Sequence, residues 1–590
     1  MGDNRNLIVA VILSVALISG WEYFVARPQM AAEKAQQAHL AHQEKSQTQL
    51  GAPQAGANGA AHLARDVALK RGGVRVAIDT PTVDGSLLLK GARFDDLRLK
   101  KYRETVSPKS PEIVLLAPQS TDYPYYAVFG WVGANNAVKV PDDNTQWKEI
   151  AGTTLSPGHP VTLSWDNGHG FVFTRQIAVD SQYMFTVSDS VANKTSANTT
   201  LYPYAYVARD GVPKVTHYWV LHEGFVGVAN GSLKDAKYAD FKENTPPQTF
   251  HSAGGWVGIT DKYWMAAVIP PQDAGFDGSF AASQASGTTD YQADYRLDGR
   301  KLASGATLTV THHLFAGAKV VQTLRDYQDR LGIQRFDMAI DWGWFWFITR
   351  PMFWLLDNFY NLVGNFGLAI LLLTVSIKLI FFPLANTSYK SMSRMKKLQP
   401  QVENIRTRFA EDRVRQQQEM MELYKREKVN PVSGCLPVLI QIPVFFSLYK
   451  VLFVTIEMRH APFFGWIHDL SAPDPTSIIN LFGLLPYGVP GFIPAFLSIG
   501  IWPILMGATQ WIQTQMNPAP ADPVQARMFS LMPIMFTFML ATFPAGLVIY
   551  WTWNNLLSVA QQYLMMWRQG VKLDLLQNLR GPKADVKAGQ

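Results

Sequence analysis

Cysteine is nearly absent from this sequence, since Cys435 is the only one among 590 residues. That excludes a disulfide framework and a zinc site built on several cysteines. Charged residues are also scarce, at 17% against about 25% in an average soluble protein. The 17 tryptophans and 33 phenylalanines point the same way, and we expect part of the chain to lie in lipid. The net charge of +7 fits an anionic membrane or RNA and does not choose between them.

Catalytic signatures are missing as well. The closest approach to a zinc-protease motif is His222-Glu223, and Val226 stands where the second histidine belongs. The sequence has no phosphate-binding loop, no dinucleotide-binding glycine pattern and no nucleophile elbow. We therefore expect a protein that is not an enzyme and that uses no metal or cofactor.

The N-terminal region predicts a membrane anchor followed by a linker. Residues 7–25 are apolar and carry Trp21 and Tyr23 near their end, where aromatic side chains mark a membrane interface. A cleaved signal peptide is the alternative, but no clear cleavage site follows. We expect an uncleaved signal anchor at 1–26. Residues 27–65 are rich in Ala, Gln, Gly and His, a composition typical of a flexible linker.

Residues 66–335 are predicted to form an all-β sandwich of antiparallel sheets. Apolar residues alternate with polar ones, as at Leu97 and Leu99, and turn pairs recur. The turn pairs are Asp84-Gly85, Asn167-Gly168, Asn230-Gly231 and Asp298-Gly299. Three tryptophans in this region have two possible roles, core packing or lining a sugar cleft, and core packing is favoured. They are Trp131, Trp256 and Trp264.

The next two segments contain the central feature of the sequence. Residues 336–364 are rich in aromatics and predict an interfacial amphipathic helix. The run 366–384 is apolar apart from one charge, Lys378, and we expect a transmembrane helix at 365–385. Thr374 lies four residues before Lys378, on the same helix face. Lys378 either snorkels to the headgroups or lies in a polar cavity inside the membrane.

A basic segment follows at 386–430. Residues 386–429 hold 11 Lys or Arg against 6 Asp or Glu, which predicts a cytoplasmic location. Apolar positions at helical spacing predict a helical hairpin with its turn at Glu411-Asp412. Four methionines on it, Met392, Met395, Met420 and Met421, suit contact with varied apolar helices. The alternative is a solvated coiled coil without a partner.

Residues 431–567 are predicted to contain four further membrane spans, at 436–457, 492–512, 529–543 and 547–567. With the anchor and the helix at 365–385 the total is six, so both termini lie on the cytoplasmic side. The tail at 568–590 is basic, in agreement with this orientation. Its cations are Arg568, Lys572, Arg580, Lys583 and Lys587.

Five long motifs occur in the order and topology of a known family. They are GGWVGITDKYWMAAVIP from Gly254, LQPQVENIRTRF from Leu398, EMMELYKREKVNPVSGCLPVLIQIPVFFSLYKVL from Glu419, FFGWIHDLSAPDP from Phe463 and FPAGLVIYWTWNNL from Phe543. Over nearly its whole length the chain resembles the YidC family of membrane protein insertases, in the Gram-negative form with a large periplasmic domain. The resemblance implies a multi-pass protein of the bacterial inner membrane. It also implies a fold of five core spans around a hydrophilic groove with one basic residue, usually arginine.

Alignment on Pro383-Leu384 places that basic residue at Lys378. Lysine is a point charge, whereas arginine binds carboxylates through two nitrogens. The hypothesis is that Lys378 attracts the acidic tail of a nascent membrane protein into the groove, helped by polar neighbours. The other groove residues are Thr374, Gln441, Tyr550, Trp551 and Asn555. The apolar segment of the substrate is then expected to slide into lipid along the third and fifth spans. Prolines at 437, 443, 533 and 544 would loosen these helices or their ends, and Pro437 and Pro443 are predicted to line the path of the substrate.

Several partners are implied in addition to nascent membrane proteins: the Sec translocon, the ribosome, the targeting machinery with its signal recognition particle receptor, and membrane lipids. The basic tail could contact ribosomal RNA or anionic lipid, and the sequence favours neither. Two functions of other classes compete with insertion. One is a solute transporter or channel with Lys378 as its binding charge. The other is a membrane-anchored periplasmic carbohydrate-active protein.

Overall fold

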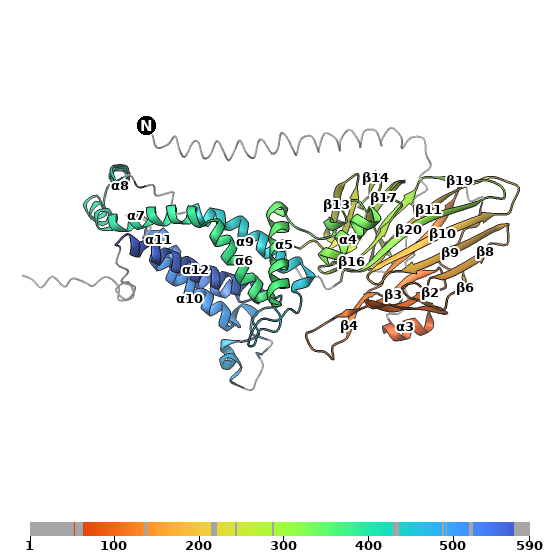
Figure 1. Ribbon diagram of the computed structural model, residues 1–590, viewed down its shortest axis with the longest axis horizontal. Coiled ribbons are helices and arrows are strands. Elements are labelled where there is room, and N and C mark those ends of the chain that lie inside the picture. The colour runs from red at the N-terminus through yellow and green to blue at the C-terminus, as the bar shows by residue number, and fades with distance from the viewer. Residues whose placement is uncertain are drawn as a thin grey trace, which may run out of the picture. The chain divides into compact units, whose positions relative to one another are not determined.

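The computed structural model describes residues 52–53, 63–134, 138–213, 221–241, 245–285, 288–427, 429, 436–485, 489–490, 492–517 and 523–570 (Figure 1). All of these except 52–53 belong to one compact unit, Ala55–Gln590. The predicted signal anchor, nearly all of the linker, and the tail beyond residue 570 lie outside the described residues.

The first part of this unit is built from strands, as the alternating pattern predicts. The strands are β1 (Arg75–Asp79), β2 (Val83–Leu88), β3 (Arg93–Arg103), β4 (Glu112–Leu116), β5 (Tyr125–Gly133), β6 (Lys148–Ala151), β7 (Thr154–Leu155), β8 (Val161–Asp166), β9 (Phe171–Val179), β10 (Met184–Asn193), β11 (Thr199–Asp210), β12 (Gly224–Ala229), β13 (Ser232–Lys237), β14 (Gln248–Ala253), β15 (Gly255–Thr260), β16 (Trp264–Ile269), β17 (Gly275–Ala285), β18 (Thr288–Leu297), β19 (Arg300–Leu302) and β20 (Thr307–Ala318). Short helices lie before, within and after them: α3 (Arg65–Arg71), η3 (Tyr238–Asp240) and α4 (Val321–Leu331).

These strands form two large sheets. One has the order β14-β17-β18-β11-β5-β3-β2-β1-β7, with β19 paired to β11 and β4 paired to β3. The other has the order β13-β12-β15-β16-β20-β10-β9-β8-β6 (Figure 1). Among the described strands the pairs are antiparallel, except for the short parallel pairing of β1 with β7. Because non-consecutive strands such as β10 and β20 are neighbours, the sheets depend on long-range contacts.

One of the predicted turn pairs forms a hairpin turn in the structure, and another lies inside a strand. Asn230-Gly231 joins β12 to β13 with positive φ at both residues (49° and 72°), as a two-residue hairpin turn of this kind requires. Asp84-Gly85, in contrast, lies inside β2, and the prediction of a turn there is wrong. The pairing of β2 with β3 shifts register between Gly85 and Leu87, and a Cβ on Gly85 would lie 2.1 Å from the carbonyl oxygen of Asp96. The glycine therefore serves a bulge and not a turn.

The two sheets share one buried core. Tyr125 on β5 donates its hydroxyl to the carbonyl of Ile259 on β15 (2.6 Å). Trp131 and Trp256 are buried in this core, at 2% and 0% exposure, so neither can line an open sugar cleft. Burial of each such side chain contributes about 1.5–3 kcal/mol or more. Trp264 is only partly buried.

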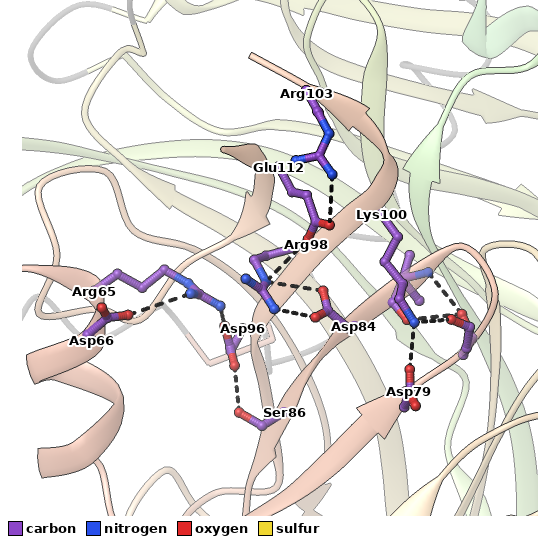
Figure 2. Close-up of polar contacts among 12 residues, drawn as sticks. Arg65, Asp66, Asp79, Asp84, Ser86, Asp96, Arg98, Lys100, Arg103 and Glu112 are labelled. Carbon is purple, nitrogen blue, oxygen red and sulfur yellow. Dashed lines mark hydrogen bonds and ion pairs between the residues drawn. The ribbon is translucent and has the colours of Figure 1, made fainter. Parts of the chain in front are cut away.

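Charged side chains form a network of ion pairs on the first strands (Figure 2). The pairs are Arg65 with Asp96, Arg98 with Asp84, Lys100 with Asp79, and Arg103 with Glu112. Arg65 belongs to α3, so its pair ties this helix to β3. The pair of Lys100 with Asp79 is largely exposed, and pairs of that kind contribute about 0–1 kcal/mol.

The second part of the unit is helical. Its helices are η4 (Phe336–Ala339), α5 (Trp346–Val363), α6 (Phe366–Ile380), α7 (Phe382–Arg408), α8 (Arg413–Arg426), α9 (Leu436–Val454), η6 (Ile456–Met458), η7 (Ile478–Gly483), η8 (Ala495–Leu497), α10 (Ile501–Met516), α11 (Pro523–Leu540) and α12 (Ala545–Arg568). Helix α12 packs against α6, α7, α9 and α10 (Figure 1). It is therefore the element that these four helices share.

Two expected helices differ from the observed ones. The run at 366–384 is divided, because α6 ends at Ile380 and α7 begins at Phe382 with Pro383 in its first turn. Residues 492–500 precede α10, where Pro494 cannot donate an amide to a preceding turn. In the part of the chain that the structure describes, no single helix has the length and apolarity of a membrane span, whereas α6 and α7, bent by 68°, meet that test together.

Candidate functional site

Lys378 lies near the end of α6, two residues before the helix ends. Asn365 caps the start of this helix by accepting a hydrogen bond from the amide of Leu368 (3.1 Å). Gly364, with φ of 68°, makes the turn that folds α6 back against α5. Tyr360 and Phe366 then stack across the turn with ring centroids 3.8 Å apart. These local contacts fix the helix that carries the charge.

The ammonium of Lys378 has a neutral partner. Its Nζ donates to the hydroxyl of Ser558 on α12 at 2.7 Å. Ser558 is 2% exposed, and its own proton goes to the carbonyl of Asn554 (2.8 Å). Among the residues that the structure describes, no carboxylate forms an ion pair with Lys378. The charge is thus oriented by a hydrogen bond but not neutralised.

The other predicted groove residues, apart from Thr374, take part in three hydrogen bonds that join α12 to α9 and α10. Gln441 on α9 donates to the hydroxyl of Tyr550 (2.6 Å). Asn555 donates to Thr509 on α10 (3.3 Å). Trp551 also contacts α10, through the side-chain oxygen of Gln510 (3.3 Å). The structure therefore brings polar side chains of α9 and α10 into contact with α12. Ser558, the hydrogen-bond partner of Lys378, lies on the same helix α12.

Thr374 forms its hydrogen bond within its own helix. Its hydroxyl donates to the carbonyl of Ile370, one turn earlier on its own helix (2.7 Å). At 2% exposure it is buried. A threonine that bonds its own helix in this way is satisfied without a neighbouring helix, and its part in the groove stays a prediction.

Sequence reasoning missed the residue that holds Lys378. Ser558 continues a polar stripe on α12 that also includes Trp551, Asn555 and Gln562. Their spacing of four, three and four residues places them on one helix face. Gln562 donates to the carbonyl of Met516 (3.2 Å) and, like Ser558, is 2% exposed. Extending the stripe from Asn555 would have found both.

The hairpin methionines differ in exposure. On α7, Met392 is buried and Met395 is partly buried; on α8, Met420 is partly buried and Met421 is exposed. Asp412 begins α8 and accepts from the amide of Arg415 (3.0 Å), which confirms the turn expected at this position.

The remaining predicted residues have these positions. Pro437 and Pro443 lie within α9, Pro533 lies within α11, and Pro544 precedes α12. Arg568 is the exposed last residue of α12. The tail cations Lys572, Arg580, Lys583 and Lys587 are outside the described residues.

A β-sheet-rich domain joined to a helical region, in which α6 and α7 together have the length and apolarity of a membrane span, fits a membrane protein with a large domain outside the membrane. Comparison with known proteins gives the family. The model of the YidC periplasmic domain matches residues 75–355, and that of the 60Kd inner membrane protein matches residues 358–571.

Curated relatives match over nearly the full length. Membrane protein insertase YidC of Methylobacterium radiotolerans is 54% identical over 609 residues, which cover 98% of this chain and 97% of that protein. The protein of the same name from Methylorubrum extorquens is 54% identical over 614 residues, with the same coverage of both chains. A crystal structure of an active YidC insertase with its first transmembrane domain resolved is 17% identical. It covers 84% of this chain and 93% of its own, with a TM-score of 0.37.

The chain belongs to the YidC family of membrane protein insertases. It is therefore an inner-membrane insertase with a periplasmic β-rich domain and a helical C-terminal region. The family also confirms the expectation that the chain is not an enzyme. It favours insertion over the transporter and carbohydrate-active alternatives.

Proposed function

We propose that the chain inserts nascent membrane proteins through a hydrophilic groove whose functional charge is Lys378. One observation carries this proposal: the ammonium of Lys378 is held by the hydroxyl of Ser558 at 2.7 Å and, among the described residues, is not paired with a carboxylate. A charge inside an apolar helix costs at least about 2.5 kcal/mol, and this site recovers little of that cost internally. The acidic tail of a substrate supplies the missing counter-charge.

The barrier to insertion is the removal of water from the polar tail of the substrate. A hydrated groove through the cytoplasmic half of the membrane shortens the distance that the tail crosses without water. The pairs Gln441–Tyr550 and Asn555–Thr509 link α9 and α10 to α12, and we assign them, with Trp551, to the polar wall of this groove. Thr374 is assigned to the same wall, as a satisfied residue next to the charge.

The apolar segment of the substrate leaves the groove along α9 and α11. Apolar side chains are exposed on α11, among them Leu531, Ile534 and Met535 at 56–57%. Pro443 and Pro533 remove backbone hydrogen bonds inside these two helices and make them easier to deform. Pro437 lies in the first turn of α9, where no intrahelical hydrogen bond is lost, and we assign it to the start of the slide. Burial of the substrate helix in lipid drives the process, so no nucleotide is required.

Contact with the substrate begins at the hairpin 386–430. Met421 is exposed and Met395 and Met420 are partly exposed, so flexible thioether side chains are available to apolar segments of varied shape. Met392 packs inward and supports the hairpin. We assign to this hairpin the reception of substrates that the ribosome and the signal recognition particle receptor deliver. We also assign to it the transfer of substrates from the Sec translocon to the groove.

The arrangement in the membrane that we propose keeps the expected six spans and both termini in the cytoplasm. It retains the predicted segments as functional units: anchor (1–26), linker (27–65), β sandwich (66–335), interfacial helix (336–364), span (365–385), hairpin (386–430), insertase core (431–567) and tail (568–590). The basic tail beginning at Arg568 contacts either ribosomal RNA or anionic lipid. Cosedimentation with ribosomes over a range of salt concentrations, with and without residues 568–590, distinguishes the two.

The proposal is tested by insertion of paired substrates, one with an acidic and one with a neutral translocated tail. We expect Lys378→Arg to retain insertion of the acidic substrate, Lys378→Ala to reduce it about tenfold, and Lys378→Glu to reduce it further by repulsion. The neutral substrate should change much less in all three variants. Equal insertion of the acidic substrate by all three would exclude an electrostatic role for Lys378.

A further inference from the structure

A cavity of about 390 Å³ lies far from Lys378 in the sequence, where two other segments meet. Its walls are the end of β3 with the loop that follows, and the loop that follows η6. The lining residues are Lys101, Arg103, Thr105, Val106, His460, Pro462 and His468. Its volume is within the range of small-ligand sites.

The lining of this cavity is basic. Four of its seven residues are Lys, Arg or His, and none is a carboxylate. Three acidic residues flank the lining: Glu104 stands between Arg103 and Thr105 in the sequence, and two others lie near lining residues. Asp469 lies 3.8 Å from His460 and accepts from the hydroxyl of Ser471 (2.7 Å). Glu112 is 4.0 Å from Arg103.

Lys101 differs from its neighbour on the same strand. Lys100 donates to Asp79 (2.6 Å) and to the carbonyl of Thr80 (2.8 Å), as Figure 2 shows for the acidic partner. Lys101 points to the other side of β3, is exposed, and has no ion pair among the described residues. The two lysines are thus a matched pair, one compensated and one free at the cavity.

The two walls are held together by direct contacts. Arg459, next to His460, donates to the backbone carbonyl of Arg103 (2.5 Å). Glu457, two residues earlier, accepts from the amide of Val321 at the start of α4 (3.0 Å). Since both contacts join this loop to the periplasmic β domain, the cavity lies on the periplasmic side.

The surroundings of the cavity suit a membrane surface, if the proposed spans hold. The loop follows α9, one of the proposed spans, after the short helix η6. Between the lining residues Pro462 and His468 stand Phe464 and Trp466, which are 58% and 39% exposed. Exposed aromatic side chains in such a loop are typical of a membrane interface.

We propose that this cavity binds the phosphate of an anionic phospholipid headgroup in the outer leaflet. Lys101 supplies the main charge-assisted hydrogen bond that phosphate oxygens accept. Arg103 donates one nitrogen to the carbonyl of Ser110 (2.7 Å) and adds its remaining N–H groups, and the histidines and Thr105 complete the donor set. A free phosphate ion has the same chemistry, but the neighbouring aromatic side chains favour a ligand that is part of the membrane. The site would tie the periplasmic domain to the lipid surface, a role separate from the groove at Lys378.

The test measures lipid binding to the full-length protein in detergent by native mass spectrometry. Short-chain phosphatidylglycerol, short-chain phosphatidylcholine and inorganic phosphate are titrated separately. We expect one phosphatidylglycerol to bind, phosphatidylcholine to bind more weakly, and phosphate to compete at high concentration. Lys101→Gln and Arg103→Gln should each weaken phosphatidylglycerol binding about fivefold, and together about 25-fold, at about 1 kcal/mol per cation.

Lys100→Gln is the matched control and should leave phosphatidylglycerol binding unchanged, because its charge is paired with Asp79. Lys101→Arg should restore binding, which separates loss of the site from loss of folding. Equal affinity in the wild type, Lys101→Gln and the double variant would overturn the proposal. Binding of inorganic phosphate that depends on Lys101, without binding of phosphatidylglycerol, would exclude a lipid as the ligand.

Discussion

Arg175 in the β domain and Lys378 in the helical region are both cations removed from bulk water, but they are compensated differently. Arg175 is 1% exposed and donates to both carboxylate oxygens of Asp189 (2.7 and 2.9 Å). It also donates to the carbonyl of Phe129 on the opposite sheet (2.7 Å). Lys378 has the single hydroxyl of Ser558. One charge is fully compensated inside the protein and the other is not.

This difference separates a charge that stabilises the fold from a charge that can bind a further ligand. Removal of an ion from water costs several kcal/mol, and only a counter-charge in good geometry offsets that cost. In the β domain the counter-charge is built in, so Arg175 links the sheets and has no capacity for another partner. In the helical region it is absent among the described residues, which is what a site for a transient acidic ligand requires.

The largest effect is expected from breaking the compensated pair. Arg175→Met leaves Asp189 buried without its partner and should destabilise the β domain by about 3–5 kcal/mol. Hydrogen exchange of the β9 and β10 amides in the full-length protein measures this change. Arg98→Met, which breaks the more exposed pair with Asp84, is the control and should cost less than about 1 kcal/mol. Similar costs for the two variants would mean that burial does not separate them.

A buried carboxyl with a neutral partner gives the next largest effect. Burial raises the pKa of Asp294 to about 7, against a hydrogen bond from the amide of Gln292 (3.0 Å) that lowers it. Between pH 4 and pH 7 the folded protein therefore retains a proton that the unfolded chain has lost, and stability falls as pH rises through this window. Asp294→Asn removes the penalty and should make the protein roughly 2 kcal/mol more stable at pH 8.

The control for this experiment is the wild type at each pH, because other groups titrate in the same domain. Burial lowers the pKa of His312 to about 4, whereas an unfolded histidine titrates near about 6.5. The contribution of His312 to stability is therefore lost as pH decreases below about 6.5, whereas that of Asp294 is lost as pH increases. The difference between Asp294→Asn and the wild type cancels this background. A difference that is the same at pH 5 and pH 8 would contradict the assignment to Asp294.

Local patterns in the sequence predicted most of the β domain but not the ends of the helices. The alternation at Leu97 and Leu99 gave β3, and Asn230-Gly231 gave a hairpin turn. Asp84-Gly85 has the same composition as a turn, but its pairing with β3 is decided by contacts outside the segment. The apolar run 366–384 likewise gives no sign that its helix divides after Ile380, beyond the proline at 383.

The site was predictable to a similar extent. Lys378 could be identified from its own segment alone, because it is the single charged residue in an apolar run of helical length. Its partner Ser558 is 180 residues away, and no local pattern joins the two. The pairing depends on how α6 packs on α12, which only the tertiary structure determines. Thr374 shares a helix face with Lys378, but its hydroxyl bonds to the carbonyl of Ile370, a partner that the shared face did not predict.

The smallest effect, and the most direct test of the comparison, concerns Ser558. Ser558→Ala removes the one hydroxyl that holds Lys378 and should destabilise the helical region by about 1 kcal/mol. Ser447→Ala on α9 is the matched control, because the hydroxyl of Ser447 is equally buried and has no hydrogen-bond partner among the residues that the structure describes. Both are measured by hydrogen exchange of the α12 amides in detergent. In a Lys378→Met background the cost of Ser558→Ala should disappear, since the interaction is already absent. A cost that persists there would show that Ser558 acts through Asn554 or through packing, and the charge of Lys378 would then lack even a neutral partner.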